Sequence, residues 1–183
     1  WGNHDILWMG AACGNEACIA NVLRNNMKYD NIKILENSYA ISLRALTLFA
    51  EQTYPELAPM DAALKAVSVI LFKLEGQIIM RHPEYDMVDR LLLDKIDHNR
   101  GVVRIGEQEY ELNDTYFPTV DAKNAYTLTE GEQHVVEDLR AAFINSHMLR
   151  KHVRFLYEKG NTYLCHNGNL LFHGCIPMTD DGE

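Results

Sequence analysis

The sequence has no long apolar run, no leader and no excess of positive charge. No stretch approaches the roughly 18 consecutive apolar residues of a membrane-spanning helix, and no signal peptide opens the 183 residues. The formal net charge is −9, which disfavours binding to nucleic acid or to an anionic membrane. We therefore expect a cytoplasmic protein with neither a nucleic-acid nor a membrane partner.

The cysteines also lack the spacing of a metal-binding or redox motif. They stand at Cys13, Cys18, Cys165 and Cys175, with no Cys-x-x-Cys pair, so neither a zinc ribbon nor a redox-active dithiol is indicated. Reduced thiols in the cytosol are the simplest interpretation. The sequence has no internal repeat, no low-complexity tract and no initiator methionine. We expect it to be an internal piece of a longer chain.

What the sequence does contain is 47% apolar residues, enough to bury one good-sized core. Much of this apolar content repeats at helical spacing. Pro55 ends one such pattern and Pro59 begins the next, while Thr129 and Glu132 form a capping-box pattern. Gly160 ends the longest pattern. We predict helices over residues 6–27, 37–54, 60–80, 85–97 and 129–159.

Two segments have the alternating pattern of β-strands. We predict a hairpin of residues 102–105 and 108–112 around a Gly106-Glu107 turn, and another of residues 162–166 and 169–173 around Asn167-Gly168. Asn-Gly is the dipeptide best suited to a type I′ turn. The remaining stretches 28–31 and 114–127 are predicted loops.

Chemically informative residues are concentrated near the beginning, in Gly2-Asn3-His4-Asp5, directly before an apolar helical segment. Asn3 offers a neutral oxygen ligand to a divalent ion, and His4 could protonate the leaving oxygen of a phosphate ester. Asp5 could orient the His4 imidazole, and the N-terminal end of the helix favours an anion. This run is typical of binuclear metallophosphoesterases, in which two divalent ions about 3.5–4 Å apart counter the charge of the phosphate.

The end of the sequence carries a second signal of this kind at His173. This histidine ends the last predicted strand, from which it would project rigidly and offer an imidazole nitrogen to a metal. Each residue taken alone has an ordinary explanation: Asp5 as a helix N-cap, Asn3 in a turn, and His4 and His173 without function. The presence of both signals in one chain favours a metal site.

Several longer segments resemble the class III fructose-1,6-bisphosphatases of Firmicutes-type bacteria. They are residues 1–11 (WGNHDILWMGA), 72–75 (FKLE), 90–97 (RLLLDKID) and 163–177, which contains NGNLLFHGCIP. The similarity covers essentially the whole chain. The helical middle is its most specific part, because ordinary phosphoesterases lack it.

The resemblance implies a gluconeogenic phosphatase of the calcineurin-like metallophosphoesterase superfamily. Such an enzyme hydrolyses fructose 1,6-bisphosphate to fructose 6-phosphate and phosphate with two divalent ions, manganese or a similar metal. By resemblance, Asn3 and His173 ligate the same metal, and His4 is the phosphate-contacting acid. The family's Asp-x-His, Gly-Asp-x-x-Asp-Arg and Gly-His-Thr motifs do not occur in these residues. We therefore expect the chain alone to be inactive and not to bind the metals stably.

The expected fold is α+β and mostly helical, with two short β-hairpins. A helical insertion, residues 33–160 with one hairpin near 102–112, would be framed by two strips of a metallophosphoesterase α/β sandwich, residues 1–32 and 161–183. The insertion is expected to fold by itself.

Two other hypotheses stay open. A Ser/Thr protein phosphatase-like enzyme would share the Gly-Asn-His-acid and His-Gly signals, but it places them far closer in sequence. Alternatively, the helical part is a regulatory or oligomerisation module. The feature behind this second hypothesis is the stretch 66–74, which is apolar nearly all round and would serve equally well as the centre of the core. Homo-oligomerisation stays open.

Overall fold

The computed structural model describes residues 1–174, 179 and 181, and within them the chain is mostly helical with two small antiparallel sheets. Cys175 and Pro177, the end of the second motif, lie outside the described residues. The helices are α1 (Asn3–Ala12), α2 (Glu16–Lys28), α3 (Lys33–Tyr39), α4 (Arg44–Thr53), α5 (Pro59–Arg81), α6 (Glu130–Asn145) and α7 (His147–Lys159). The strands are β1 (Ile96–Asp97), β2 (Val102–Ile105), β3 (Gln108–Glu111), β4 (Tyr163–His166) and β5 (Asn169–Phe172).

The predicted helix over residues 6–27 is wrong as a single helix, because the chain breaks between α1 and α2. Gly14 has φ +83°, a conformation that favours glycine. Asn15 then begins α2 by accepting the backbone N–H of Cys18 at 2.9 Å. The two helices pack closely beside this break, since a Cβ on Gly10 would lie 2.6 Å from the Cys18 Sγ.

Two further predicted helices also divide. The helix predicted over residues 37–54 is instead α3 and α4, and α3 ends at Ala40 with φ +54°. The helix predicted over residues 129–159 divides at Ser146, whose N–H donates to Phe143 at the end of α6. The Ser146 hydroxyl accepts the N–H of Leu149 to begin α7, and it donates to the Tyr39 carbonyl at 2.7 Å. One buried serine thus closes one helix and opens the next.

The helix predicted over residues 85–97 is absent from the described structure. Three short 3₁₀ turns replace it, Pro83–Tyr85, Val88–Arg90 and Leu93–Lys95, followed by β1. Asp86 takes φ +51°, which no α-helix accommodates. β1 pairs with β2 to extend the predicted hairpin to the sheet β1-β2-β3.

Other local predictions are confirmed. Pro59 is the first residue of α5, and the Thr129 hydroxyl accepts the N–H of Glu132 while the Glu132 carboxylate accepts that of Thr129. Gly160 follows the last residue of α7. Asn167 and Gly168 have φ values of 49° and 75° between β4 and β5, as a type I′ turn requires.

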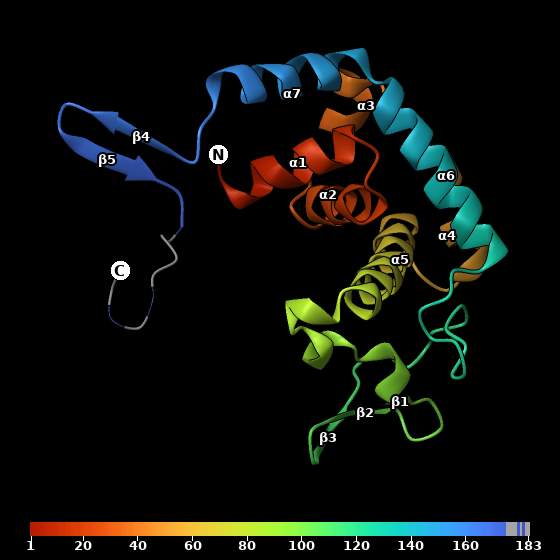
Figure 1. Ribbon diagram of the computed structural model, residues 1–183. Helices are drawn as coiled ribbons and strands as arrows, with labels where there is room; N and C mark the ends of the chain where they lie inside the picture. The colour runs from red at the N-terminus through yellow and green to blue at the C-terminus, as the bar shows by residue number, and fades with distance from the viewer. Residues whose placement is uncertain (175–178, 180, 182–183) are drawn as a thin grey trace.

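One apolar core joins the helices. α5 lies against α2 and α4, while α6 and α7 run along one side of the bundle and contact α1 (Figure 1). Ala66, Val67, Ile70, Leu71 and Leu74 of α5 are all buried in this core. Most of the apolar stretch 66–74 therefore packs inside the chain, while Phe72 is 43% exposed.

A buried ion pair crosses this core. The Lys73 Nζ of α5 donates to the Glu132 Oε2 of α6 and to the Thr119 carbonyl, both at 2.6 Å. Both charged side chains are essentially excluded from solvent. Because a buried charge needs its partner, this contact links α5, α6 and the loop before α6.

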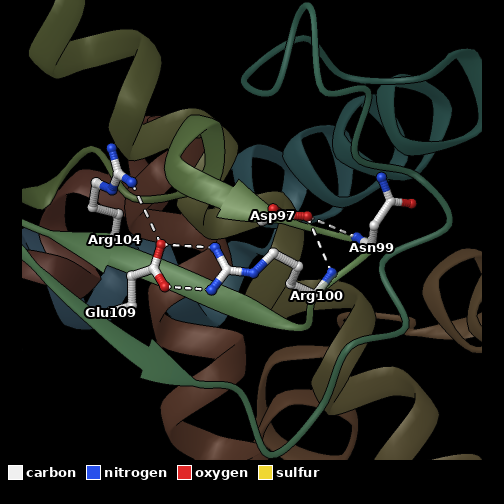
Figure 2. Close-up of polar contacts among 5 residues, drawn as sticks. All are labelled: Asp97, Asn99, Arg100, Arg104 and Glu109. Carbon is white, nitrogen blue, oxygen red and sulfur yellow. Dashed lines mark hydrogen bonds and ion pairs between the residues drawn. The ribbon is translucent and has the colours of Figure 1, made fainter.

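The β1-β2-β3 sheet carries polar contacts at its surface (Figure 2). Arg100 makes a two-bond contact with Glu109, at 2.9 and 2.6 Å, and Arg104 approaches the same carboxylate at 3.4 Å. Asp97 accepts the backbone N–H groups of Asn99 and Arg100 and so closes the turn after β1.

The β4–β5 hairpin projects from the end of α7 and lies away from the helices, except near the start of α1 (Figure 1). All eight of its strand residues are exposed. In the part of the chain that the structure describes, no helix is long and apolar enough to cross a membrane.

Candidate functional site

The two ends of the described chain meet at Asn3 and His173. The His173 Nε2 lies 3.0 Å from the Asn3 Oδ1, although 170 positions separate the two residues. Asn3 is in the first turn of α1, and His173 directly follows β5. The structure thus brings together the two residues that the sequence nominates as metal ligands.

Gly2 allows this approach. A Cβ at Gly2 would lie 3.0 Å from three atoms of the His173 ring, tighter than ordinary van der Waals contact. Gly2 has φ −101°, so the backbone itself does not demand glycine. The requirement comes from the histidine ring, and sequence reasoning had not given Gly2 a separate role.

The first turn of α1 is fixed by its own capping contact. The helix begins at Asn3 and not after Asp5, and its N-cap is Gly2, so the N-cap interpretation of Asp5 is wrong. Asp5 instead reaches back, and its Oδ2 accepts the Gly2 N–H at 2.8 Å. This contact is half of a capping box. It holds Asn3 and His4 inside a formed helical turn.

His4 points to a different place from Asn3. Its side chain is exposed and lines a shallow depression of about 230 Å³ with Trp8, Asn25 and Tyr29. The Asp5 carboxylate accepts the Gly2 N–H. Its predicted role in orienting the His4 imidazole stays a prediction.

The separation of Asn3 and His173 fits two ligands of one octahedral ion. With bonds of about 2.1 Å at right angles, adjacent donors lie about 3.0 Å apart. The Asn3 oxygen and an imidazole nitrogen are donors that divalent manganese or a similar ion accepts. In the tautomer with hydrogen on Nε2, that N–H donates to the Asn3 oxygen. A metal would bind Nε2 in place of this hydrogen, and the neutral imidazole would then carry its hydrogen on Nδ1.

Two donors are too few for a metal pair. Over residues 1–174, 179 and 181, no three His, Cys, Asp or Glu side chains gather in a way that could hold an ion. Three of the other histidines have partners elsewhere: His82 lies beside Glu84, His134 near Asp138, and His152 beside Tyr39. The described residues therefore fit part of a metal centre.

The end of α7 reaches the same place. The Trp1 indole Nε1 donates to the Leu156 carbonyl in the last turn of α7 at 2.9 Å. A Cβ at Gly160 would lie only 1.9 Å from that indole nitrogen. Trp1 is thus seated directly on Gly160, two residues before the candidate ligand Asn3. Sequence reasoning gave Gly160 only the role of ending the helix, and it gave Trp1 none.

Comparison with known proteins gives one consistent result. A family model described as Firmicute fructose-1,6-bisphosphatase matches residues 1–183. The chain is similar to a class 3 fructose-1,6-bisphosphatase of Clostridium novyi (strain NT), with 47% identity over an alignment of 201 positions, and to one of Clostridium botulinum (strain Hall), with 49% identity over 202 positions. A Listeria innocua relative is 47% identical over 202. Each alignment covers all of this chain. The chain spans about 30% of the length of these relatives. No solved structure matches it.

Proposed function

Because the chain belongs to the Firmicute fructose-1,6-bisphosphatase family, we propose that it is part of an enzyme that hydrolyses fructose 1,6-bisphosphate to fructose 6-phosphate and phosphate. The observation that carries this proposal is the 3.0 Å approach of the Asn3 oxygen to the His173 nitrogen. A contact between residues so distant in sequence, both of metal-binding type and both exposed, is typical of a ligand site.

Asn3 and His173 would hold one divalent ion, manganese or a similar metal, at the edge of a two-metal centre. When bound, such a pair neutralises phosphate charge and activates water for attack. His4 lies in the same helical turn as Asn3 and would donate a proton to the leaving oxygen of the sugar. The N-terminal end of α1 adds a partial positive charge near the phosphate. Asp5 would act by holding this turn in place.

The two regions around this site would be strips of a larger catalytic core. Both faces of the β4–β5 hairpin are apolar: Tyr163 pairs with Phe172 on one face, and Leu164 with Leu171 on the other. An isolated two-stranded hairpin is marginally stable in water. We propose that residues 161–183 join a sheet formed by the rest of the longer protein, as expected of a metallophosphoesterase sandwich.

Residues 33–160 would be the insertion that these strips frame. The helices α1 and α2 of residues 1–32 nevertheless share their core with α5, α6 and α7. Residue 32 would therefore not separate two structural units. Asn3 and His4 would serve the catalytic site, and the rest of α1 and α2 would pack with the other helices. Most of the apolar stretch 66–74, the feature behind the oligomerisation alternative, is buried, but Phe72 is 43% exposed; homo-oligomerisation stays an alternative.

The test is manganese-dependent phosphate release from fructose 1,6-bisphosphate by the full-length enzyme. We expect His4→Ala to lower kcat by about 10²-fold or more, because it removes the proton donor. The matched control is His147→Ala, at an exposed histidine that begins α7. An inactive full-length protein, or equal activity in both variants, would refute the proposal.

A further inference from the structure

We propose that Trp1 and Gly160 are positioning residues that align Asn3 with His173, so that the seat of Trp1 on α7 sets the affinity of the metal site. This inference rests on the proposed function, because it assumes that Asn3 and His173 are ligands. It assigns a task to two residues that touch neither the metal nor the substrate.

The first observation is the hydrogen bond from the Trp1 indole to the Leu156 carbonyl, at 2.9 Å. Leu156 also accepts the backbone N–H of Gly160 at 2.8 Å. A carbonyl oxygen has two lone pairs, so the Leu156 oxygen accepts the indole N–H in addition to the backbone N–H of Gly160. Trp1 is thereby tied to the end of α7.

The second observation is the lack of a side chain at residue 160. Gly160 has φ −82° and ψ 159°, values that any residue adopts. Glycine is needed here because a Cβ would lie 1.9 Å from the Trp1 Nε1 and 2.5 Å from the Leu156 oxygen. Gly160 therefore leaves the space that the Trp1 indole occupies, in addition to ending the helix.

The third observation is that the chain returns to the same place. From Gly160 it passes through the β4–β5 hairpin and comes back at His173, which contacts Gly2 and Asn3. Trp1 and Asn3 stand two positions apart at the start of the chain, and Gly160 and His173 stand at the two ends of the hairpin segment. The seat at Gly160 and the approach at Gly2 therefore fix the hairpin relative to α1 at two points.

In this arrangement the packing of the helices determines how Asn3 is placed relative to His173. α7 is anchored in the helical core through Leu149 and Val153, so the position of its last turn follows the packing of the helices. Metal ligands must be held within about 0.5 Å of their productive geometry. A shift of the indole seat would move Asn3, two residues along, away from His173.

The decisive variant is Trp1→Phe in the full-length enzyme, which keeps an aromatic ring but removes the Nε1–H donor. The control is Tyr157→Phe, because Tyr157 lies on the same turn of α7 with an exposed side chain. Manganese affinity is measured from the loss of the spin-resonance signal of free Mn²⁺. We expect binding weakened about tenfold in Trp1→Phe, the usual effect of losing a residue that supports a ligand, and unchanged binding in Tyr157→Phe.

Two further readouts separate alignment from general loss of structure. Hydrogen exchange in the metal-free protein should become faster in residues 163–172 of Trp1→Phe, with little change in α5. Saturating Mn²⁺ should restore kcat, because the chemical groups are intact. Gly160→Ala, which fills the seat from the other side, should weaken metal binding in the same way.

Unchanged manganese affinity in both Trp1→Phe and Gly160→Ala would overturn the inference even if the wild-type enzyme is active. So would weakened affinity accompanied by equal loss of protection throughout the helices, since that result indicates general destabilisation. A wild-type protein that neither binds Mn²⁺ nor hydrolyses the sugar bisphosphate would instead refute the proposed function.

Discussion

The helices and the β4–β5 hairpin of this chain use apolar residues in opposite ways. The helices bury one face against one another, where Phe143, for example, is 0% exposed, while apolar side chains on their outer faces, such as Phe155 at 62%, are exposed. In the hairpin the apolar side chains face solvent, and Phe172 is 48% exposed. Six of the eight strand residues of the hairpin are apolar, so its exposure does not come from a lack of apolar side chains.

The difference indicates where each segment finds its partners. The helices satisfy one another within these residues, while the hairpin presents apolar side chains on both faces with no layer against either. Strands that are apolar on both faces are typical of the interior of a larger sheet. We therefore propose that the helical part folds by itself and that the hairpin packs against the remainder of the longer protein.

The largest expected effect separates folding from activity. We predict that this chain alone gives the cooperative thermal unfolding of a helical protein, followed by circular dichroism, but no phosphate release from fructose 1,6-bisphosphate with Mn²⁺. The physical reason is that Asn3 and His173 supply only two donors of a site that needs several. The full-length enzyme is the positive control. Hydrolysis by this chain above the buffer rate would show that it is catalytically complete.

The same substitution in both regions sharpens the comparison. In this chain, Phe143→Ala should lower the free energy of unfolding by about 3–5 kcal/mol, because it opens a cavity in the core. Phe172→Ala should change it by less than about 0.5 kcal/mol, as at other surface positions. Chemical denaturation measures both values. In the full-length enzyme Phe172→Ala should become clearly destabilising; equal, small effects in both proteins would contradict the proposed burial of the hairpin.

Local signals in the sequence were sufficient for much of this fold. Pro59, the Thr129–Glu132 capping box and the Asn167-Gly168 turn each act through neighbouring residues, and each was placed correctly. The mostly helical α+β class follows from the same periodicity. These features need no knowledge of tertiary structure.

The predictions that failed have both local and distant causes: the break after α1 lies at Gly14 and Asn15, whereas the break at Ser146 involves a distant residue. Ser146 is not an obvious helix breaker, and its role depends on its bond to the Tyr39 carbonyl, which is remote in sequence. The 85–97 segment has helical spacing, but β1 pairs with β2 instead. Nor does the sequence reveal that Lys73 is buried against Glu132. At Ser146 a tertiary contact overrides the local helical preference.

The candidate site shows the same division. Asn3, His4, Asp5 and His173 could be named from motifs, because the chemistry restricts which residue types serve. Gly2, Trp1 and Gly160 could not, because their importance lies in the space between two segments that the sequence holds far apart. Glycines beside a motif are the only signal that could have pointed to them.

The smallest predicted effect concerns the pH dependence of the helical part, which the hairpin should not share. Burial, reinforced by the negative charges of Glu132 and Asp114, raises the pKa of Tyr54 to about 12. In the unfolded chain a tyrosine has a pKa of about 10. The folded state therefore holds the proton more tightly, and this contribution to stability is complete below pH 10 and is lost as the pH rises towards 12.

Tyr54→Phe should accordingly unfold with a weaker dependence on pH between about 10 and 12, as measured by chemical denaturation of this chain at several pH values. Some dependence should persist, because burial and a hydrogen bond to Asp94 also raise the pKa of Tyr126. Tyr29→Phe, at an exposed position of the same helical part, should follow the wild type. If Tyr54→Phe and Tyr29→Phe have the same slope, the phenol of Tyr54 is accessible to hydroxide. The helical core would then be less tightly closed than its contrast with the hairpin implies.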